Sequence, residues 1–136
     1  MKEDYVYEDI EKMEYLTACV KELLRYSPPT NGVIPRVATK TFPLKDLIVK
    51  KGDLVGQLYM MNFNREDIFL SPLEFMPERF LEAKNGGSVK HPVVPNVLYT
   101  PFSTGQRRCI GQYLGEVMIK VVVIEFIKMF KWSVIS

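Results

Sequence analysis

With 136 residues, the chain is long enough for one ordinary domain and no more, and its 47% hydrophobic content excludes wholesale disorder. The formal net charge of +2 is too small to indicate binding to nucleic acid or to an anionic membrane surface. Two cysteines do not make a disulfide framework, and the polar, charged N-terminal residues do not resemble a signal peptide. The most apolar stretch, residues 113–130, contains four charged residues, which argue against a transmembrane span.

The first predicted element is a helix over residues 5–26, with a separate helical turn at 8–13 as an alternative start. Its end is set by Pro28 and Pro29, because the residue before a proline is disfavoured in helical conformation. On this helix Glu22 flanks the apolar face and Arg25 points nearly away from it, so the residues alone indicate a solvated surface pair. The apolar face is predicted from the four-residue interval of Tyr15, Leu16, Cys19, Val20, Leu23 and Leu24.

Residues 33–61 change to a strand-like composition. Partial alternation over 36–42, a β-rich run at 47–49 and another at 54–61, with a turn signal at 50–53, predict a small antiparallel sheet. Such short strands are not expected to be stable as an isolated hairpin.

Residues 62–101 are punctuated by proline and glycine and are predicted to be mostly irregular, with short helical pieces at 65–69 and 72–75. An irregular segment of this length is usually functional or disordered. His91, the only histidine, lies here and is interpreted as a surface loop residue.

A last helix is predicted over residues 111–130. Glu116 and Lys120 are four residues apart in the orientation that stabilises a helix by a few tenths of a kcal/mol. Its buried side is predicted to be formed by Leu114, Val117, Met118, Val121, Val122 and Phe126.

Cys109 stands directly before this last helix. Arg108 precedes it, and Gly105 and Gly111 lie four residues before and two after it. Positive charge and a helix N-terminus both favour the thiolate form of cysteine, which is the form that binds metal. Glycine allows another body to approach the main chain closely. These residues indicate a thiolate in a loop that a flat or bulky group approaches.

The loop matches the pattern Phe-x-x-Gly-x-Arg-x-Cys-x-Gly at Phe102, Gly105, Arg107, Cys109 and Gly111. This pattern closely resembles the haem-binding loop of the cytochromes P-450, the haem-thiolate monooxygenases. Two further stretches, Glu-x-x-Arg at residues 22–25 and Pro-Glu-Arg-Phe at residues 77–80, resemble two other motifs of that family in the family's order.

The resemblance implies that Cys109 is the axial ligand to the iron of haem b, iron protoporphyrin IX. It implies that Arg107 and Arg36 pair with the haem propionates, because a guanidinium forms two parallel hydrogen bonds with a carboxylate. Phe102 and Gly111 would lie against the haem and the sulfur. The segment before Arg36 lines the substrate pocket in the family, which makes Val33 and Ile34 candidate substrate contacts.

The resemblance also implies that Glu22, Arg25 and Arg79 form one buried network beneath the haem. Two guanidinium groups would share one carboxylate, with main-chain carbonyls accepting from the remaining donors. This role is structural, and the resemblance assigns no catalytic residue within this chain. Cys19, on the apolar face of the first helix, is interpreted as an inert core residue.

The expected fold is therefore mainly α with a small antiparallel sheet, an α+β arrangement corresponding to the C-terminal, haem-proximal part of the cytochrome P-450 fold. Residues 1–136 would form a partial domain, without the helix that crosses the distal face of the haem. We expect this polypeptide by itself to bind haem weakly or not at all.

The implied function is insertion of one oxygen atom from O2 into an apolar organic substrate, with electrons from a reductase. A non-catalytic remnant or truncated gene product, a haem-thiolate isomerase or dehydratase, a redox-sensing thiol protein, and iron ligation by His91 are alternatives. The family allows an endoplasmic reticulum location, but the chain shows no membrane anchor or signal of its own, so its location is left open. Substrate, regiochemistry and electron donor are not specified by these residues.

Overall fold

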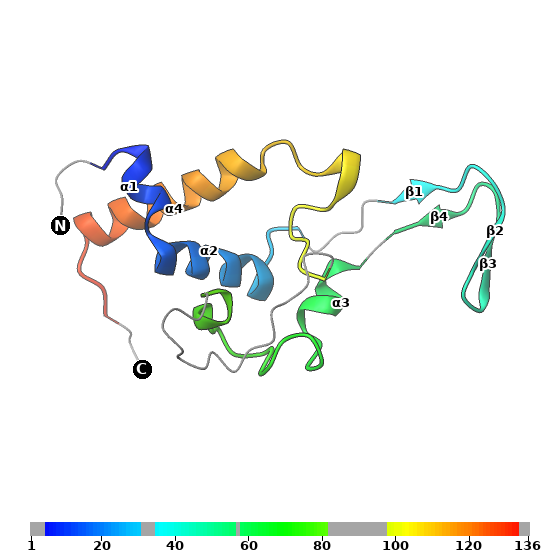
Figure 1. Cartoon of the computed structure of the whole chain (residues 1–136), viewed down its shortest axis with the longest axis horizontal. Coiled ribbons are helices and arrows are strands. Elements are labelled where there is room, and N and C mark those ends of the chain that lie inside the picture. The colour runs from blue at the N-terminus through cyan, green and yellow to red at the C-terminus, as the bar shows by residue number, and fades with distance from the viewer. Residues whose placement is uncertain (1–4, 31–34, 57, 82–97, 134–136) are drawn as a thin grey trace.

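The computed structural model describes residues 5–30, 35–56, 58–81 and 98–133. It is mainly helical with short antiparallel strands, which confirms the expected α+β class. Figure 1 shows α1, α2 and α4 gathered at one end of the molecule, α3 in the middle and the strands at the opposite end. In chain order the helices and strands are α1 (Tyr7–Glu11), α2 (Glu14–Tyr26), β1 (Arg36–Val37), β2 (Phe42–Leu44), β3 (Leu47–Val49), β4 (Leu54–Val55), α3 (Tyr59–Phe63), η1 (Pro77–Phe80), η3 (Gly105–Arg107) and α4 (Gln112–Met129).

The N-terminal helical region consists of two helices, with a break at Lys12 and Met13, and not of one helix over 5–26. The second helix ends at Tyr26, just before the two prolines, as predicted. The predicted apolar face is only partly right, because Tyr15 and Leu23 are exposed. Helix α2 packs against α4, α3 and η1. More than one side of it is therefore covered, and its buried residues are Ala18, Val20, Glu22, Leu24 and Arg25.

The strands form two separate two-stranded ladders. Strand β1 pairs with β4, and β2 pairs with β3, both antiparallel. The hairpin between β2 and β3 turns at Lys45 and Asp46, with Leu44 paired to Leu47 across the turn, and Lys45 has a φ of 49°. The predicted strand over 54–61 is wrong beyond Val55. The described part of β1 offers two partner residues, so the ladder stops, and the following residues form α3.

The segment between α3 and η1 has no regular secondary structure. The helical pieces predicted at 65–69 and 72–75 are wrong, since these residues form turns and bends. Their proline, serine and asparagine neighbours favour turns over a propagating helix. A small core nevertheless forms here, in which Phe63, Ile68 and Phe69 are buried and pack against Phe80, Leu98 and Tyr99.

Helix α4 has nearly the predicted bounds, but its predicted buried side is wrong. Leu114 is 63% exposed and Met118 is 57% exposed, and Val121, Val122 and Phe126 are also exposed. Helices α1 and α2 pack against α4, and the buried residues of α4 are Lys120 and Ile124, which lie on one strip of the helix. The ammonium Nζ of Lys120 lies 3.4 Å from Oε1 of Glu11, which joins α4 to α1. Within the described ranges, no helix combines the length and the apolar character that crossing a bilayer requires.

Candidate functional site

The loop before α4 folds back on itself, so that the main chain at Cys109 is hydrogen-bonded to the beginning of the loop. The amide N–H of Cys109 donates to the carbonyl of Phe102 at 2.9 Å. Two residues between them, Ser103 and Gly105, have positive φ values of 66° and 69°, which turn the chain. A side chain at Gly105 would be strained because L residues rarely adopt that φ, although a Cβ there would meet no atom within 4 Å. Glycine is therefore required here by its backbone angle and not by crowding.

The thiol of Cys109 is exposed at the entrance to α4. Gly111 is the N-cap residue of that helix, and the amide of Gln112 donates to the Cys109 carbonyl at 3.4 Å. A Cβ at Gly111 would lie 3.8 Å from the Cys109 Sγ, an ordinary contact. Gly111 has a φ of −84°, so its place in the motif is not explained by its own backbone conformation.

Arg107, Arg108 and Arg36 are the arginines that could place positive charge near a group bound at the loop, and their surroundings differ. Arg107 is exposed in η3, and Arg36 is exposed at the start of β1. Arg108, which was predicted to place positive charge beside Cys109 and not to bind a propionate, donates from Nε to Oε1 of Gln112 at 2.6 Å. Gln112 in turn donates from Nε2 to Glu116 at 2.8 Å, so Arg108 is directed along the first turns of α4. The exposed Arg107 and Arg36 keep their guanidinium groups accessible to an acidic ligand.

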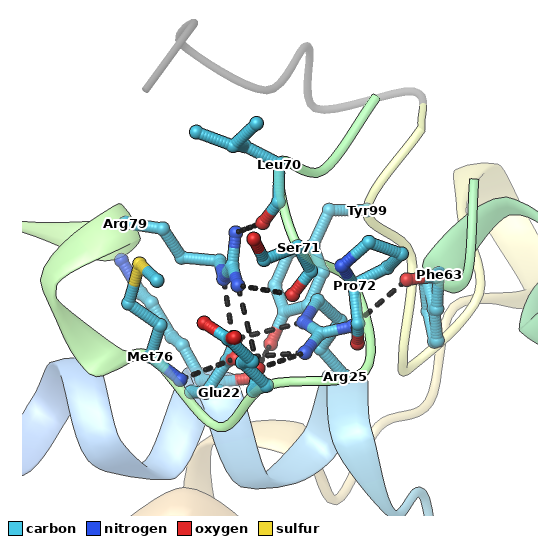
Figure 2. A network of polar contacts seen from close by, with 11 residues as sticks. Glu22, Arg25, Phe63, Leu70, Ser71, Pro72, Met76, Arg79 and Tyr99 are labelled. Atoms are coloured by element: carbon cyan, nitrogen blue, oxygen red, sulfur yellow. Dashed lines mark hydrogen bonds and ion pairs between the residues drawn. The ribbon is translucent and has the colours of Figure 1, made fainter. Parts of the chain in front are cut away.

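Glu22, Arg25 and Arg79 lie together in one buried cluster, as the family resemblance implies (Figure 2). Arg25 forms a two-pronged contact with Glu22, from Nη2 to Oε1 at 2.7 Å and from Nε to Oε2 at 2.8 Å. Arg79 Nε donates to the same Glu22 Oε1 at 3.1 Å, and the amide of Met76 donates to it at 2.9 Å. All three charged side chains are almost completely buried. The surface-pair interpretation of Glu22 and Arg25 is therefore wrong.

The two guanidinium groups also hold the irregular segment between α3 and η1. Their remaining N–H groups donate to main-chain carbonyls at 2.8 to 3.4 Å. Phe69 lies beneath both, with its ring centroid 5.3 Å from the Arg25 Cζ and 6.0 Å from the Arg79 Cζ. The carbonyls that accept belong to Phe63, Leu70, Ser71, Pro72 and Glu74.

Tyr99 connects the start of the cysteine loop to α2, a role that sequence reasoning missed. Its hydroxyl donates to the carbonyl of Lys21 at 2.8 Å, and its ring packs 4.9 Å from Phe80 and 5.7 Å from Phe63 between centroids. Burial raises the pKa of Tyr99 well above its ordinary value, so the hydroxyl stays protonated and donates. An aromatic residue just before the Pro-Phe start of the loop is the only sequence signal for this contact.

The remaining predicted residues are partly buried or lie outside the described part of the chain. Phe102 is partly buried and supplies the carbonyl that holds Cys109. Cys19 is half-buried, and burial raises the pKa of its thiol, as expected for an inert core residue. The candidate substrate contacts Val33 and Ile34, and also His91, lie outside the described residues.

The comparison with protein families establishes which family the chain belongs to. The model of the family described as Cytochrome P450 matches residues 2–136. The chain belongs to the cytochrome P450 family. A solved cytochrome P450, the retinoic acid-bound cyanobacterial CYP120A1, has the same fold over 96% of this chain and 29% of its own, with a TM-score of 0.80 and 28% identity.

Individual P450 relatives come from plants, fungi and insects. The chain is 35% identical over 130 residues to (S)-canadine synthase of Coptis japonica, which covers 95% of this chain and 26% of that protein. It is 34% identical over 129 residues to the cytochrome P450 monooxygenase helB2 of Aspergillus fumigatus, covering 93% and 24%. It is 37% identical over 121 residues to cytochrome P450 6l1 of Blattella germanica, covering 87% and 22%. The chain thus spans about a quarter of the length of these relatives.

The residues present fit the cofactor of a P450. An exposed thiol at a helix start suits a ligand to haem iron, and a bound porphyrin would supply the nitrogen ligands, so a single protein ligand from this loop is sufficient. Gly105 leaves open space on the loop, and Arg107 is exposed two residues before the sulfur. Among the described residues no group of three or more His, Cys, Asp or Glu side chains gathers as it would for a metal held by protein ligands alone.

Proposed function

We propose that this chain is the haem-proximal part of a haem-thiolate monooxygenase that inserts one oxygen atom from O2 into an apolar organic substrate. The observation that carries the proposal is the exposed Cys109 thiol, held by its amide bond to Phe102 at the entrance to α4. When bound, the haem supplies the oxygen-activating chemistry, and a cysteine ligand favours O–O cleavage. The electrons would come from a reductase.

Cys109 would hold the iron through its thiolate. Its hydrogen-bonded main chain fixes the sulfur between the turn at Gly105 and the first turn of α4. The amides at the helix start, which lack intrahelical partners, would moderate electron donation from the sulfur. Arg107 and Arg36 would bind the two propionates and so orient the porphyrin in its plane.

Glu22, Arg25 and Arg79 would act on the site indirectly. They fix the irregular segment that precedes the cysteine loop, while Tyr99 anchors the start of that loop to α2. We expect their loss to destabilise the fold and release haem, without changing the ligation of haem that remains bound. These residues are therefore positioning residues.

The test is haem titration of the 136-residue chain, followed by the absorption spectrum of the ferrous–CO complex. We expect weak, sub-stoichiometric binding with the Soret position typical of thiolate-ligated haem, because the exposed apolar side of α4 indicates that cover is lacking. A second arm uses a chimera, in which residues 1–136 replace the matching segment of the cyanobacterial relative. That segment has the same fold.

Cys109→Ala should abolish the thiolate signature in both arms, whereas Cys19→Ala, which changes the only other cysteine, should preserve it. If Cys109→Ala leaves the spectrum unaltered in either arm, the ligand assignment is wrong. A chimera that binds haem through Cys109 but oxidises no substrate with a reductase present would favour the non-catalytic alternative.

A further inference from the structure

Two tyrosines meet where the first helix packs against the last one. Tyr7 is the first residue of α1 and Tyr113 is the second residue of α4, and these two helices are in contact (Figure 1). The centroids of the two rings are 6.0 Å apart, with an angle of 50° between the ring planes. This separation lies within the range of aromatic rings in contact. Two phenol groups from opposite ends of the sequence are thus brought together.

The pair differs from the other aromatic contacts in its composition. Among the ring contacts between described residues, it is the one in which both partners are tyrosines, whereas Tyr26 and Tyr99 pack against phenylalanines. Tyr7 is 40% exposed and Tyr113 is 61% exposed, so a solute can reach both rings. Exposed side chains also change rotamer quickly. The two rings can therefore move closer together without a change in the backbone.

A carboxylate lies beside this pair. Glu11 follows Tyr7 by four residues, which places both side chains on the same face of α1. Hydrogen bonding to Tyr113 raises the pKa of the Tyr7 hydroxyl, and partial burial and the negative charge of Glu11 raise it further. The ammonium of Lys120 also contacts Glu11, at 3.4 Å. Tyr7 is thus protonated at neutral pH and has a proton acceptor within reach.

We propose that Tyr7 and Tyr113 form an oxidative modification site, at which peroxidase-type oxidation by hydrogen peroxide joins the two rings as dityrosine. Each phenol loses one electron and one proton, and the two phenoxyl radicals form a carbon–carbon bond between ring positions next to the hydroxyls. The hydrogen on each of those carbons then moves to the phenol oxygen, which restores both aromatic rings. The two electrons and two protons reduce one hydrogen peroxide to two waters. Glu11 accepts the proton that leaves Tyr7.

The cross-link fastens α1 to the helix that follows Cys109. Helix α1 has only five residues, and its side-chain ion pair with α4 is the one between Glu11 and Lys120. The new bond closes a loop that contains α2, η1 and the cysteine loop. Like a disulfide, it restricts the unfolded chain and so stabilises the folded one. The proposal requires no bound haem, so it stands or falls independently of the proposed oxygenase function.

The test treats the dilute 136-residue chain with hydrogen peroxide and a haem peroxidase, and detects dityrosine by its blue fluorescence and by peptide mass spectrometry. We expect a monomeric product that has lost two hydrogen atoms, in which the peptides containing Tyr7 and Tyr113 are joined. The purified product should have a melting temperature at least about 5 °C higher than the untreated chain. N-acetyltyrosine in a parallel reaction checks that the oxidant is active.

Tyr7→Phe and Tyr113→Phe should each abolish the dityrosine fluorescence of the monomer, because phenylalanine has no phenol to oxidise. The matched controls are Tyr15→Phe and Tyr26→Phe. They remove tyrosines of similar exposure, 56% and 49%, and should leave the yield unchanged. Circular dichroism of each variant checks that helix content is retained.

The proton acceptor is tested by the rate of cross-linking. Glu11→Gln should slow the reaction severalfold, because the amide is a much weaker base than the carboxylate. Glu8→Gln changes an exposed carboxylate of the same helix and should leave the rate unchanged. Equal rates for the two variants would contradict the assignment of Glu11.

Three results would overturn the modification site. The first is a monomer without dityrosine although N-acetyltyrosine is cross-linked under the same conditions. The second is a set of joined peptides that contains other tyrosines in place of Tyr7 and Tyr113. The third is dityrosine found only in covalent dimers, which would mean that the two rings react between molecules and not within one.

Discussion

Glu22 and Arg79, which are 57 residues apart in the sequence, share a hydrogen bond of 3.1 Å in a site that excludes solvent from both side chains. The same carboxylate also binds Arg25, so the cluster contains two guanidinium groups and one carboxylate (Figure 2). Main-chain carbonyl dipoles supply the remaining negative potential around the guanidinium groups. Among the described residues, the Glu22 carboxylate is therefore the one anionic group that forms an ion pair with both arginines.

Removal of that carboxylate should destabilise the protein strongly. In Glu22→Ala, two buried guanidinium groups lose their counter-ion, and we expect the free energy of unfolding to fall by about 3–5 kcal/mol. Urea denaturation followed by circular dichroism measures the change. The matched control is Arg65→Ala, which breaks an ion pair with Asp67 whose side chains are both more than half exposed. That variant should change stability by less than about 1 kcal/mol. Equal effects for the two variants would contradict a buried network.

The buried hydroxyl of Thr100 should be dispensable. Its Oγ1 is buried and has no hydrogen-bond partner among the described residues. Thr100→Val removes the unsatisfied group while keeping the shape, so stability should be unchanged or rise by about 1 kcal/mol. Thr17→Val is the control, because the Thr17 hydroxyl donates to the carbonyl of Met13 at 3.0 Å and its loss should cost about 1 kcal/mol. A larger loss for Thr100→Val would mean that the hydroxyl is bonded in solution.

The two cysteines should differ in reactivity. Cys109 is exposed, whereas Cys19 is half-buried and its thiol pKa is raised, mainly by burial and also by the charge of Glu78. Thiolate is the reactive form, so a maleimide at neutral pH should modify Cys109 first, as peptide mass spectrometry would show. Haem added beforehand should slow modification of Cys109 and leave the rate at Cys19 unchanged. Faster modification of Cys19 would show that α2 opens away from η1.

Alkaline pH should weaken the anchor at Tyr99. Its pKa is higher in the folded protein than the ordinary value of about 10, because burial disfavours the phenolate. The resulting stabilisation is fully present below pH 10 and is lost as the pH rises above it, because the unfolded chain releases the proton first. Thermal unfolding between pH 8 and 11 should therefore show a smaller decline for Tyr99→Phe than for the unmodified chain. At pH 8 the variant should be less stable by about 1 kcal/mol, because it lacks the bond to Lys21.

Local patterns in the sequence were sufficient for the C-terminal end of α2, for the bounds of α4 and for the existence of the sheet. Pro28 ends α2, and the spacing of apolar residues predicts α4 to within one residue at each end. The extent of β4 was not predictable from composition, because a strand continues only where a partner strand does. The described β1 is two residues long, so β4 stops at Val55 although the following residues favour strands.

Burial was predicted less well than secondary structure. A helical wheel puts Arg25 on the solvent side of α2, yet Arg25 is buried because the segment between α3 and η1 packs over that side. Amphipathic patterns identify one covered face, whereas α2 is covered on several. The same limit explains α4, whose apolar residues outnumber the positions that α1 and α2 can cover. Only the motif resemblance anticipated the cluster of Glu22 with Arg79.

Apart from the stacking on Phe69, Arg25 and Arg79 hold the irregular segment through its carbonyl oxygens. A carbonyl oxygen is the same whichever side chain its residue carries. Positions such as Leu70 and Ser71 are therefore open to replacement by other residues that accept the same backbone angles, while the arginines that hold them are not. The side chains of this segment, and the surface that they form, can thus vary while the hydrogen bonds from Arg25 and Arg79 to its main chain are kept.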